Sequence, residues 1–479
     1  MDTATATAAP APPSPGSPFR RPALLRLLLL ALAPSLACAG AKTPTPTVSK
    51  PPRAAARPPS QPLEGEKAQL VQAAMAEAAQ VRGLAFTEEV EAREGGPELV
   101  AWLVDRAIAE SKASGRFEAD AAMLQAFRFI PPGYDLEGAL ETLLGEQARG
   151  IYDHRDRTLL VIDLPPGEAG EAAALEAAGI EPLKLYLVHE LVHALQDQHF
   201  DLSRLMDERP ELTEDTSQAY RALAEGDASY AMYDWLLTQS AGRHIYEVPN
   251  LEQIRDGIRK GLEAPQSTAL REAPLYLRET LLFAYADGLL FVDALYRDGG
   301  WERVNAAYES PPTTTEQILH PEKYLAGEGA LAVEAPPAGD LEAGGFTKVA
   351  EGRLGELGLS LFLQALAGEE AVDRGVAAGW GGDHYTVWRD PAGRLGAAWR
   401  IRFDAPDLAD RFAEAAAPIF SSAPELWWRR EGPDGFLLRI GLPEPPTAAS
   451  GSEPADRTAE RGREAERKRA ARHGRTLRG

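Results

Sequence analysis

Two histidines and a glutamate are spaced so that they could bind and use a metal ion. The stretch KLYLVHELVHALQDQHF places His189, Glu190 and His193 in an apolar run without Pro or Gly, which predicts a helix. Side chains four residues apart lie on the same helix face, so both imidazoles can reach one cation. Glu190 lies next to them and can accept a proton from a water molecule at that cation. The pattern predicts one zinc ion with Glu190 as a general base.

A catalytic zinc site takes three protein ligands, so a third ligand must come from elsewhere in the chain. His199 has the spacing of the HExxHxxGxxH pattern, but that pattern needs a Gly where this chain has Gln196, because the helix must break sharply there. Glu225 lies in RALAEGDASYAMYDW, which predicts a second amphipathic helix able to bring a carboxylate beside the two imidazoles. Of these two candidates we favour Glu225.

The two stretches together resemble a known family. HELVHALQDQHF followed by ALAEGDASY resembles the gluzincin branch of the zincin metallopeptidases, in which an HExxH helix is joined by a Glu from the next helix. The chain is also similar, over residues 149–325, to exported bacterial zincins with a Gly-x-Tyr-Asp strand before that helix. The resemblance implies that His189, His193 and Glu225 bind zinc, that Glu190 is the catalytic base, and that the substrate is a peptide or protein.

Such a reaction needs further polar groups around the metal. A second donor to the tetrahedral oxyanion is typically Tyr or His, and His320 is our first choice because Pro321 places it at the end of a short helical piece. Tyr285 and Tyr324 are the alternatives. The ligand imidazoles also need acceptors for their second nitrogen, which Asp197 or Asp227 could supply.

The surrounding pattern predicts an α+β fold. Helical spacing of apolar residues occurs over residues 70–81, 99–108 and 357–367, and residues 148–163 predict a β-hairpin around the polar turn HRDR. We expect a zincin-like core with a small mixed sheet, an HExxH helix and a Glu-ligand helix, followed by a C-terminal α/β region. In this core the second arm of the hairpin, residues 158–162, is the expected edge strand for an extended substrate.

The two ends of the chain differ from its middle. Arg20, Arg21 and Arg26 precede the short apolar run of residues 27–33, which is typical of an export signal. Cys38 lies either within a small-x-small cleavage site or at a lipoprotein site, where it would be lipidated. We expect a periplasmic, membrane-anchored or secreted protein. The expected segments are a signal peptide (1–39), a Pro-rich linker (40–63), a zincin-like domain (64–330), an accessory α/β region (331–445) and a charged disordered tail (446–479).

Composition excludes several partners and cofactors. The formal net charge of −22 would repel phosphate backbones, so we expect no nucleic-acid partner. The single cysteine excludes a multi-cysteine metal site, so His and carboxylates must supply the ligands. We expect a monomer acting on peptide or protein. The alternative function is a non-catalytic envelope scaffold or binding lipoprotein stabilised by zinc.

Overall fold

The computed structural model describes residues 57–145, 150–162, 175–177, 179–206, 212–262 and 268–446. The expected signal peptide, Cys38, most of the linker and nearly all of the charged tail lie outside the described residues. Within those ranges the chain forms two sheets and many helices, so the predicted α+β class is confirmed. None of the described helices combines the length and the apolar character that crossing a membrane requires.

The first sheet has four strands in the order β1-β2-β4-β3. Strand β4 pairs in parallel with β2 and antiparallel with β3, so the sheet is mixed, as expected. The β3–β4 hairpin confirms the hairpin predicted from the sequence. The last residues of the expected linker are already structured, because Gln61 and Pro62 form β1. The strands are β1 (Gln61–Pro62), β2 (Glu91–Gly95), β3 (Gly150–Asp153) and β4 (Thr158–Ile162).

The expected edge strand, Thr158–Ile162, is in fact a central strand, and that prediction was wrong. All five residues of β4 are buried. Leu160 and Ile162 pack in a small core with α3 (Pro97–Ser114), while Leu159 and Val161 face the main core. A continuous apolar run buried on both faces is typical of an interior strand, whereas an edge strand usually alternates. The edge beside the histidine helix is formed by β3 instead.

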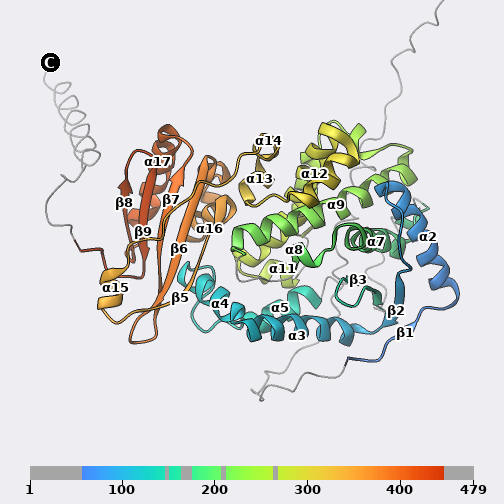
Figure 1. Ribbon diagram of the computed structural model, residues 1–479, viewed down its shortest axis with the longest axis horizontal. Helices are drawn as coiled ribbons and strands as arrows, with labels where there is room; N and C mark the ends of the chain where they lie inside the picture. Colours follow the sequence, from blue (N-terminus) through green and yellow to red (C-terminus); the bar gives the residue numbers. More distant parts are fainter. Residues whose placement is uncertain are drawn as a thin grey trace, which may run out of the picture.

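Helices form the middle of the molecule (Figure 1). The histidine helix α7 and the glutamate helix α9 pack on each other, and the long helix α12 lies along α9. At Gly300 the backbone of α12 takes φ +64° and ψ −160°, a conformation that favours Gly and kinks this helix. The helices of this layer and its borders are α2 (Gly65–Arg82), α4 (Arg116–Ala126), α5 (Leu136–Gly145), α7 (Pro182–Phe200), α8 (Ser203–Met206), α9 (Glu214–Ala241), α10 (Glu252–Leu262), α11 (Thr268–Glu272), α12 (Leu275–Glu309), α13 (Thr315–Leu319) and α14 (Pro321–Leu325), with a 3-10 turn at Ile245–Glu247.

The second sheet, with α17, lies at one end of the long axis (Figure 1). It is antiparallel, with five strands in the order β5-β6-β7-β9-β8. Its core is continuous with that of the helical layer, because Phe127 at the end of α4 packs edge-on against Phe362, Tyr385 and Trp399. The elements are α15 (Gly339–Ala343), β5 (Thr347–Gly352), α16 (Gly355–Ala367), β6 (Trp380–Arg389), β7 (Leu395–Phe403), α17 (Pro406–Ser422), β8 (Leu426–Glu431) and β9 (Gly435–Ile440), with 3-10 turns at Glu369–Ala371 and Arg374–Ala377.

Helices α9 and α12 approach closely at a pair of glycines. A Cβ atom added to Gly226 would collide with the backbone of Gly288, and one added to Gly288 would collide with the carbonyl oxygen of Ala222. Gly226 directly follows Glu225 in the sequence. The position of the Glu225 helix therefore depends on the absence of side chains at this crossing.

Replacement of Gly288 by Ala should destabilise the fold. The added methyl must push backbone away from backbone, and overpacking of this kind costs about 1–3 kcal/mol. We expect a lower midpoint in urea unfolding followed by far-UV circular dichroism, measured with a chelator present. Gly339→Ala is the matched control, because nothing lies within 4 Å of a Cβ at Gly339. Equal midpoints for the two variants would contradict the close crossing.

Candidate metal centre

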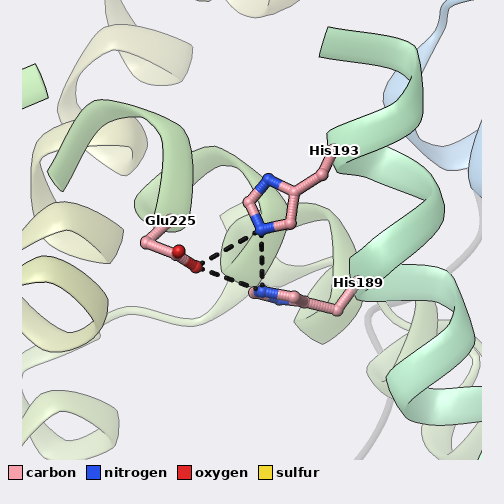
Figure 2. A group of neighbouring side chains, drawn as sticks. All are labelled: His189, His193 and Glu225. Carbon is pink, nitrogen blue, oxygen red and sulfur yellow. Dashed lines mark hydrogen bonds and ion pairs between the residues drawn. The ribbon is translucent and has the colours of Figure 1, made fainter. Parts of the chain in front are cut away.

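Helix α7 holds the two histidines in a fixed relation. It begins with Pro182 at its first turn, and the Glu181 side chain accepts a hydrogen bond from the Lys184 backbone N–H at 2.8 Å. No further Pro or Gly follows before its end. His189 and His193, four residues apart, therefore project from one face, and their Nε2 atoms lie 3.2 Å apart (Figure 2).

Helix α9 brings Glu225 to the same point. Its Oε2 lies 3.2 Å from Nε2 of His189 and 3.4 Å from Nε2 of His193 (Figure 2). Ligand atoms about 2.1 Å from a zinc ion in tetrahedral geometry lie roughly 3.4 Å from one another. The three atoms thus have the spacing and the chemical types, two imidazole nitrogens and one carboxylate oxygen, that suit a zinc site with an open fourth position.

The charges in this cluster favour a cation. Burial disfavours a charged Glu225, but the neighbouring His193 and His189 outweigh it and lower the pKa of the carboxyl group. Burial likewise opposes a proton on His193, but Glu225 outweighs it and raises the imidazole pKa to about 9. Without a metal ion, the positive charge of protonated His193 thus balances the negative charge of the Glu225 carboxylate. A divalent ion would provide the same balance and displace that proton.

Glu190 lies next to the cluster but points toward the sheet. Its Oε2 accepts a hydrogen bond from the backbone N–H of Tyr152 in β3 at 2.8 Å. Gly150 leaves room for it, since a Cβ there would lie only 3.2 Å from Cγ of Glu190. Burial raises the pKa of Glu190, and the charges of His189 and His193 act in the opposite direction. Glu190 therefore lies outside the ligand set and is positioned by the edge strand β3.

A buried chain of polar groups orients His193. Its Nδ1 lies 2.8 Å from Oε1 of Gln196, and an amide oxygen can only accept, so Nδ1 carries the proton and Nε2 is free for a metal. The Gln196 amide nitrogen donates to Asp227 at 3.1 Å and to the carbonyl oxygen of Ala224 at 3.0 Å. Asp227 in turn pairs with Arg82 at 2.7 Å. The side chains of Gln196, Asp227 and Arg82 are fully buried.

Gln196 makes the contact with a ligand imidazole that we expected from Asp197 or Asp227. Asp227 reaches the imidazole only through Gln196. Asp197 instead accepts hydrogen bonds from the Tyr152 hydroxyl at 2.9 Å and from the Leu202 backbone N–H at 3.1 Å. The signal for Gln196 was its place three residues after His193, one turn along the same face.

The other candidate side chains lie in different surroundings. The structure does not bring His320 to the cluster: its Nε2 lies 3.0 Å from Oε1 of Glu356, a contact between α13 and α16. The hydroxyl of Tyr324 donates to the Ser310 carbonyl oxygen at 2.8 Å. His199 is exposed, and its Nε2 lies 2.8 Å from the carbonyl oxygen of Ala85. Of the two candidates for a third ligand, only Glu225 lies at the His pair.

Tyr285 of α12 does lie at the cluster. Its ring stacks on that of His189 with centroids 6.0 Å apart. Burial, followed by the charges of Glu225 and Glu190, raises the pKa of its phenol well above the usual value, while the positive charge of Arg221 acts in the opposite direction. Tyr285 therefore remains a hydrogen-bond donor beside the cluster. Of the three side chains considered as donors to an oxyanion, it is the one that contacts a ligand histidine.

A cleft of about 730 Å³ opens at the cluster. Glu225 and Tyr285 line it, together with other residues of α9 and α12. Another wall comes from α3, α4 and α5 and is mainly apolar. Its volume lies within the usual range for ligand sites, about 300–1,000 Å³. The apolar lining residues are Val104, Ala107, Ile108, Phe117, Met123, Leu124, Leu136, Leu140, Leu143, Met206, Leu277 and Leu281.

A second group of acids has the spacing of a cation site, but a lysine ammonium already lies among its carboxylates. Carboxylate oxygens of Glu316, Glu328 and Asp404 lie within 4.8 Å of one another. The Lys323 ammonium lies 2.6 Å from Glu316 and 2.9 Å from Glu328, and it also contacts Asp404. This ammonium supplies the positive charge that the three carboxylates need, so we do not assign a metal there.

Comparison with known proteins bears on the C-terminal sheet only. The model of a domain of unknown function, DUF8575, matches residues 345–437. This range runs from just before β5 into β9 and lies within the region 331–445 expected from the sequence. No curated protein and no solved structure matches the chain. The histidine cluster must therefore be interpreted from its own geometry.

Replacement of Gln196 by Ala should weaken metal binding. Without its amide oxygen, His193 loses the acceptor that holds its ring and tautomer, and loss of such a partner typically reduces metal affinity about 10- to 100-fold. We expect this loss in a competitive zinc titration with a chromophoric chelator. Gln198→Ala is the matched control, since Gln198 on the same helix binds the backbone of Thr87 and Glu88 instead. A folded Gln196 variant with wild-type affinity would contradict the orienting role.

Proposed function

We propose that the chain is an exported zincin-like metallopeptidase of the gluzincin type, which hydrolyses peptide bonds in extended peptide or protein substrates. The observation that carries this proposal is the donor set: His189, His193 and Glu225 present three ligand atoms 3.2–3.4 Å apart, with Glu190 adjacent but outside the set. A purely structural zinc site usually takes four protein ligands. A site with three ligands and a neighbouring carboxylate suits hydrolysis.

The roles of the chain's own groups follow from their positions. Zinc, when bound, supplies a Lewis acid that polarises the substrate carbonyl and lowers the pKa of water toward about 7. Glu190 accepts the proton of the attacking water and passes it to the nitrogen of the departing amine. The backbone N–H of Tyr152 holds Oε2 of Glu190 at 2.8 Å during this exchange. Tyr285 donates its phenol hydrogen to the oxygen on which negative charge develops.

The edge strand β3 offers the place for an extended substrate. The N–H of Tyr152 faces away from β4, because it donates to Glu190 on α7. In an extended strand the carbonyl of the same residue faces the same edge, so the Tyr152 oxygen can accept a hydrogen bond from a substrate N–H. Strand addition at β3, rather than at the buried β4, would place the peptide beside Glu190.

The Glu190→Gln variant tests the enzymatic proposal. The amide keeps the size of the side chain but cannot accept the proton, so zinc should remain bound while cleavage falls by about 100-fold or more. The measurement is zinc content by mass spectrometry together with cleavage of casein and of a peptide library. If the wild type binds one zinc per chain and cleaves nothing in either assay, the scaffold alternative gains and the peptidase proposal fails.

Removal of the Tyr285 hydroxyl tests the oxyanion donor. We expect Tyr285→Phe to keep zinc and to lower kcat about 100-fold, because a donor to the developing charge is lost, with a smaller change in KM. His320→Gln is the comparison, since its imidazole contacts Glu356 away from the cluster, and we expect its kcat to stay close to wild type. The opposite ranking of the two variants would restore His320 to the role first predicted for it.

A further inference from the structure

The acids along the cleft are balanced by arginines of the same region. Oε2 of Glu110 lies 3.2 Å from Nη2 of Arg155. Asp120 and Glu214 both pair with Arg116, at 2.8 and 3.4 Å. These carboxylates therefore add little uncompensated negative charge to the cleft.

Arg221 is different, because it has no acid partner among the described residues. It lines the same cleft and is exposed to solvent, and its guanidinium donates a long hydrogen bond of 3.4 Å to the amide oxygen of Gln218. It precedes Glu225 by four residues on α9, so the two side chains start about 6 Å apart on one helix face. Within the described part of the chain, a guanidinium without an acid partner thus lies one helical turn from Glu225.

The wall of the cleft formed by α3, α4 and α5 is mainly apolar. Val104 and Ile108 of α3, Leu124 of α4 and Leu140 of α5 line it. An occupant that satisfies both walls must combine an anionic group with a bulky apolar group close to it. A peptide end has this chemistry, since its last residue carries a carboxylate and a side chain on the same Cα atom.

We propose that Arg221 binds the free C-terminal carboxylate of the substrate, while the apolar wall holds a large aliphatic or aromatic side chain of its last residues. This inference rests on the proposed peptidase function and deepens it to cleavage at the carboxyl end. An extended chain advances about 3.5 Å per residue, so a terminal carboxylate one or two residues beyond the scissile carbonyl falls roughly 3.5–7 Å away. That span is comparable to the spacing of about 6 Å between Glu225 and Arg221, which are one helical turn apart. A guanidinium can bind a carboxylate through two parallel hydrogen bonds.

The experiment compares two peptides that differ only at their end, one with a C-terminal Leu carboxylate and one with the Leu amide. With the zinc-loaded wild type we expect kcat/KM to be roughly 10- to 100-fold higher for the acid, the usual range for a hydrogen bond to a charged group. In the Arg221→Met variant, kcat/KM for the peptide acid should fall to the value for the peptide amide. Arg243→Met is the matched control for net charge, because Arg243 is exposed just after α9 and does not line the cleft.

A binding measurement separates this inference from the peptidase proposal. Titration calorimetry with zinc-loaded Glu190→Gln protein should show tighter binding of the acid than of the amide by a similar factor, and Arg221→Met in that background should abolish the difference. If the wild type cleaves both peptides equally, the carboxylate site is wrong and the peptidase proposal stands. If nothing is cleaved but the acid binds preferentially through Arg221, the carboxylate site stands and the peptidase proposal fails. Equal binding of both peptides overturns the site.

Discussion

The site depends on one electrostatic constraint: the largely buried carboxylate of Glu225 lies against two imidazoles and needs nearby positive charge to balance its own. Glu225 has its pKa lowered by His193 and His189 against the effect of burial, and His193 has its pKa raised to about 9 by Glu225. An isolated buried carboxylate would be costly, so the folded state needs either protons on the imidazoles or a metal ion at this point. Our proposal of a metal ion rests on the geometry of the three converging ligand atoms.

Several distant parts of the chain keep these atoms together. The glycine pair Gly226 and Gly288 lets α12 lie directly on α9, which sets the position of the helix that carries Glu225. On the other side, Arg82 of α2 pairs with Asp227 and lies over the ring of Trp301 at 4.2 Å. Asp227 accepts a hydrogen bond from the Gln196 amide, and the Gln196 oxygen accepts one from His193. Breaking a buried pair of this kind is strongly destabilising because it leaves an uncompensated charge, so the support around the ligands is also part of the core.

Local patterns predicted the parts of the site that lie within one helix or hairpin. Periodicity and spacing alone predict the helix of His189 and His193, the helix of Glu225 and the hairpin of residues 150–162. The edge strand could not be predicted in this way, because the order β1-β2-β4-β3 depends on pairing between β4 and the polar β2, about 65 residues earlier. The contact of His320 with Glu356 could not be predicted for a similar reason, since Glu356 belongs to a helix that only the tertiary structure brings near. The orienting role of Gln196 could not be predicted either, because its link to Asp227 requires two helices to pack.

The central claim is that one metal ion joins His189, His193 and Glu225, and anomalous diffraction from crystals grown with zinc tests it most directly. Data collected on both sides of the zinc absorption edge should show one strong peak about 2.0–2.2 Å from Nε2 of each histidine and from a carboxylate oxygen of Glu225. A crystal with these side chains ordered but no peak between them, or a peak bound by a different set of residues, would contradict the account.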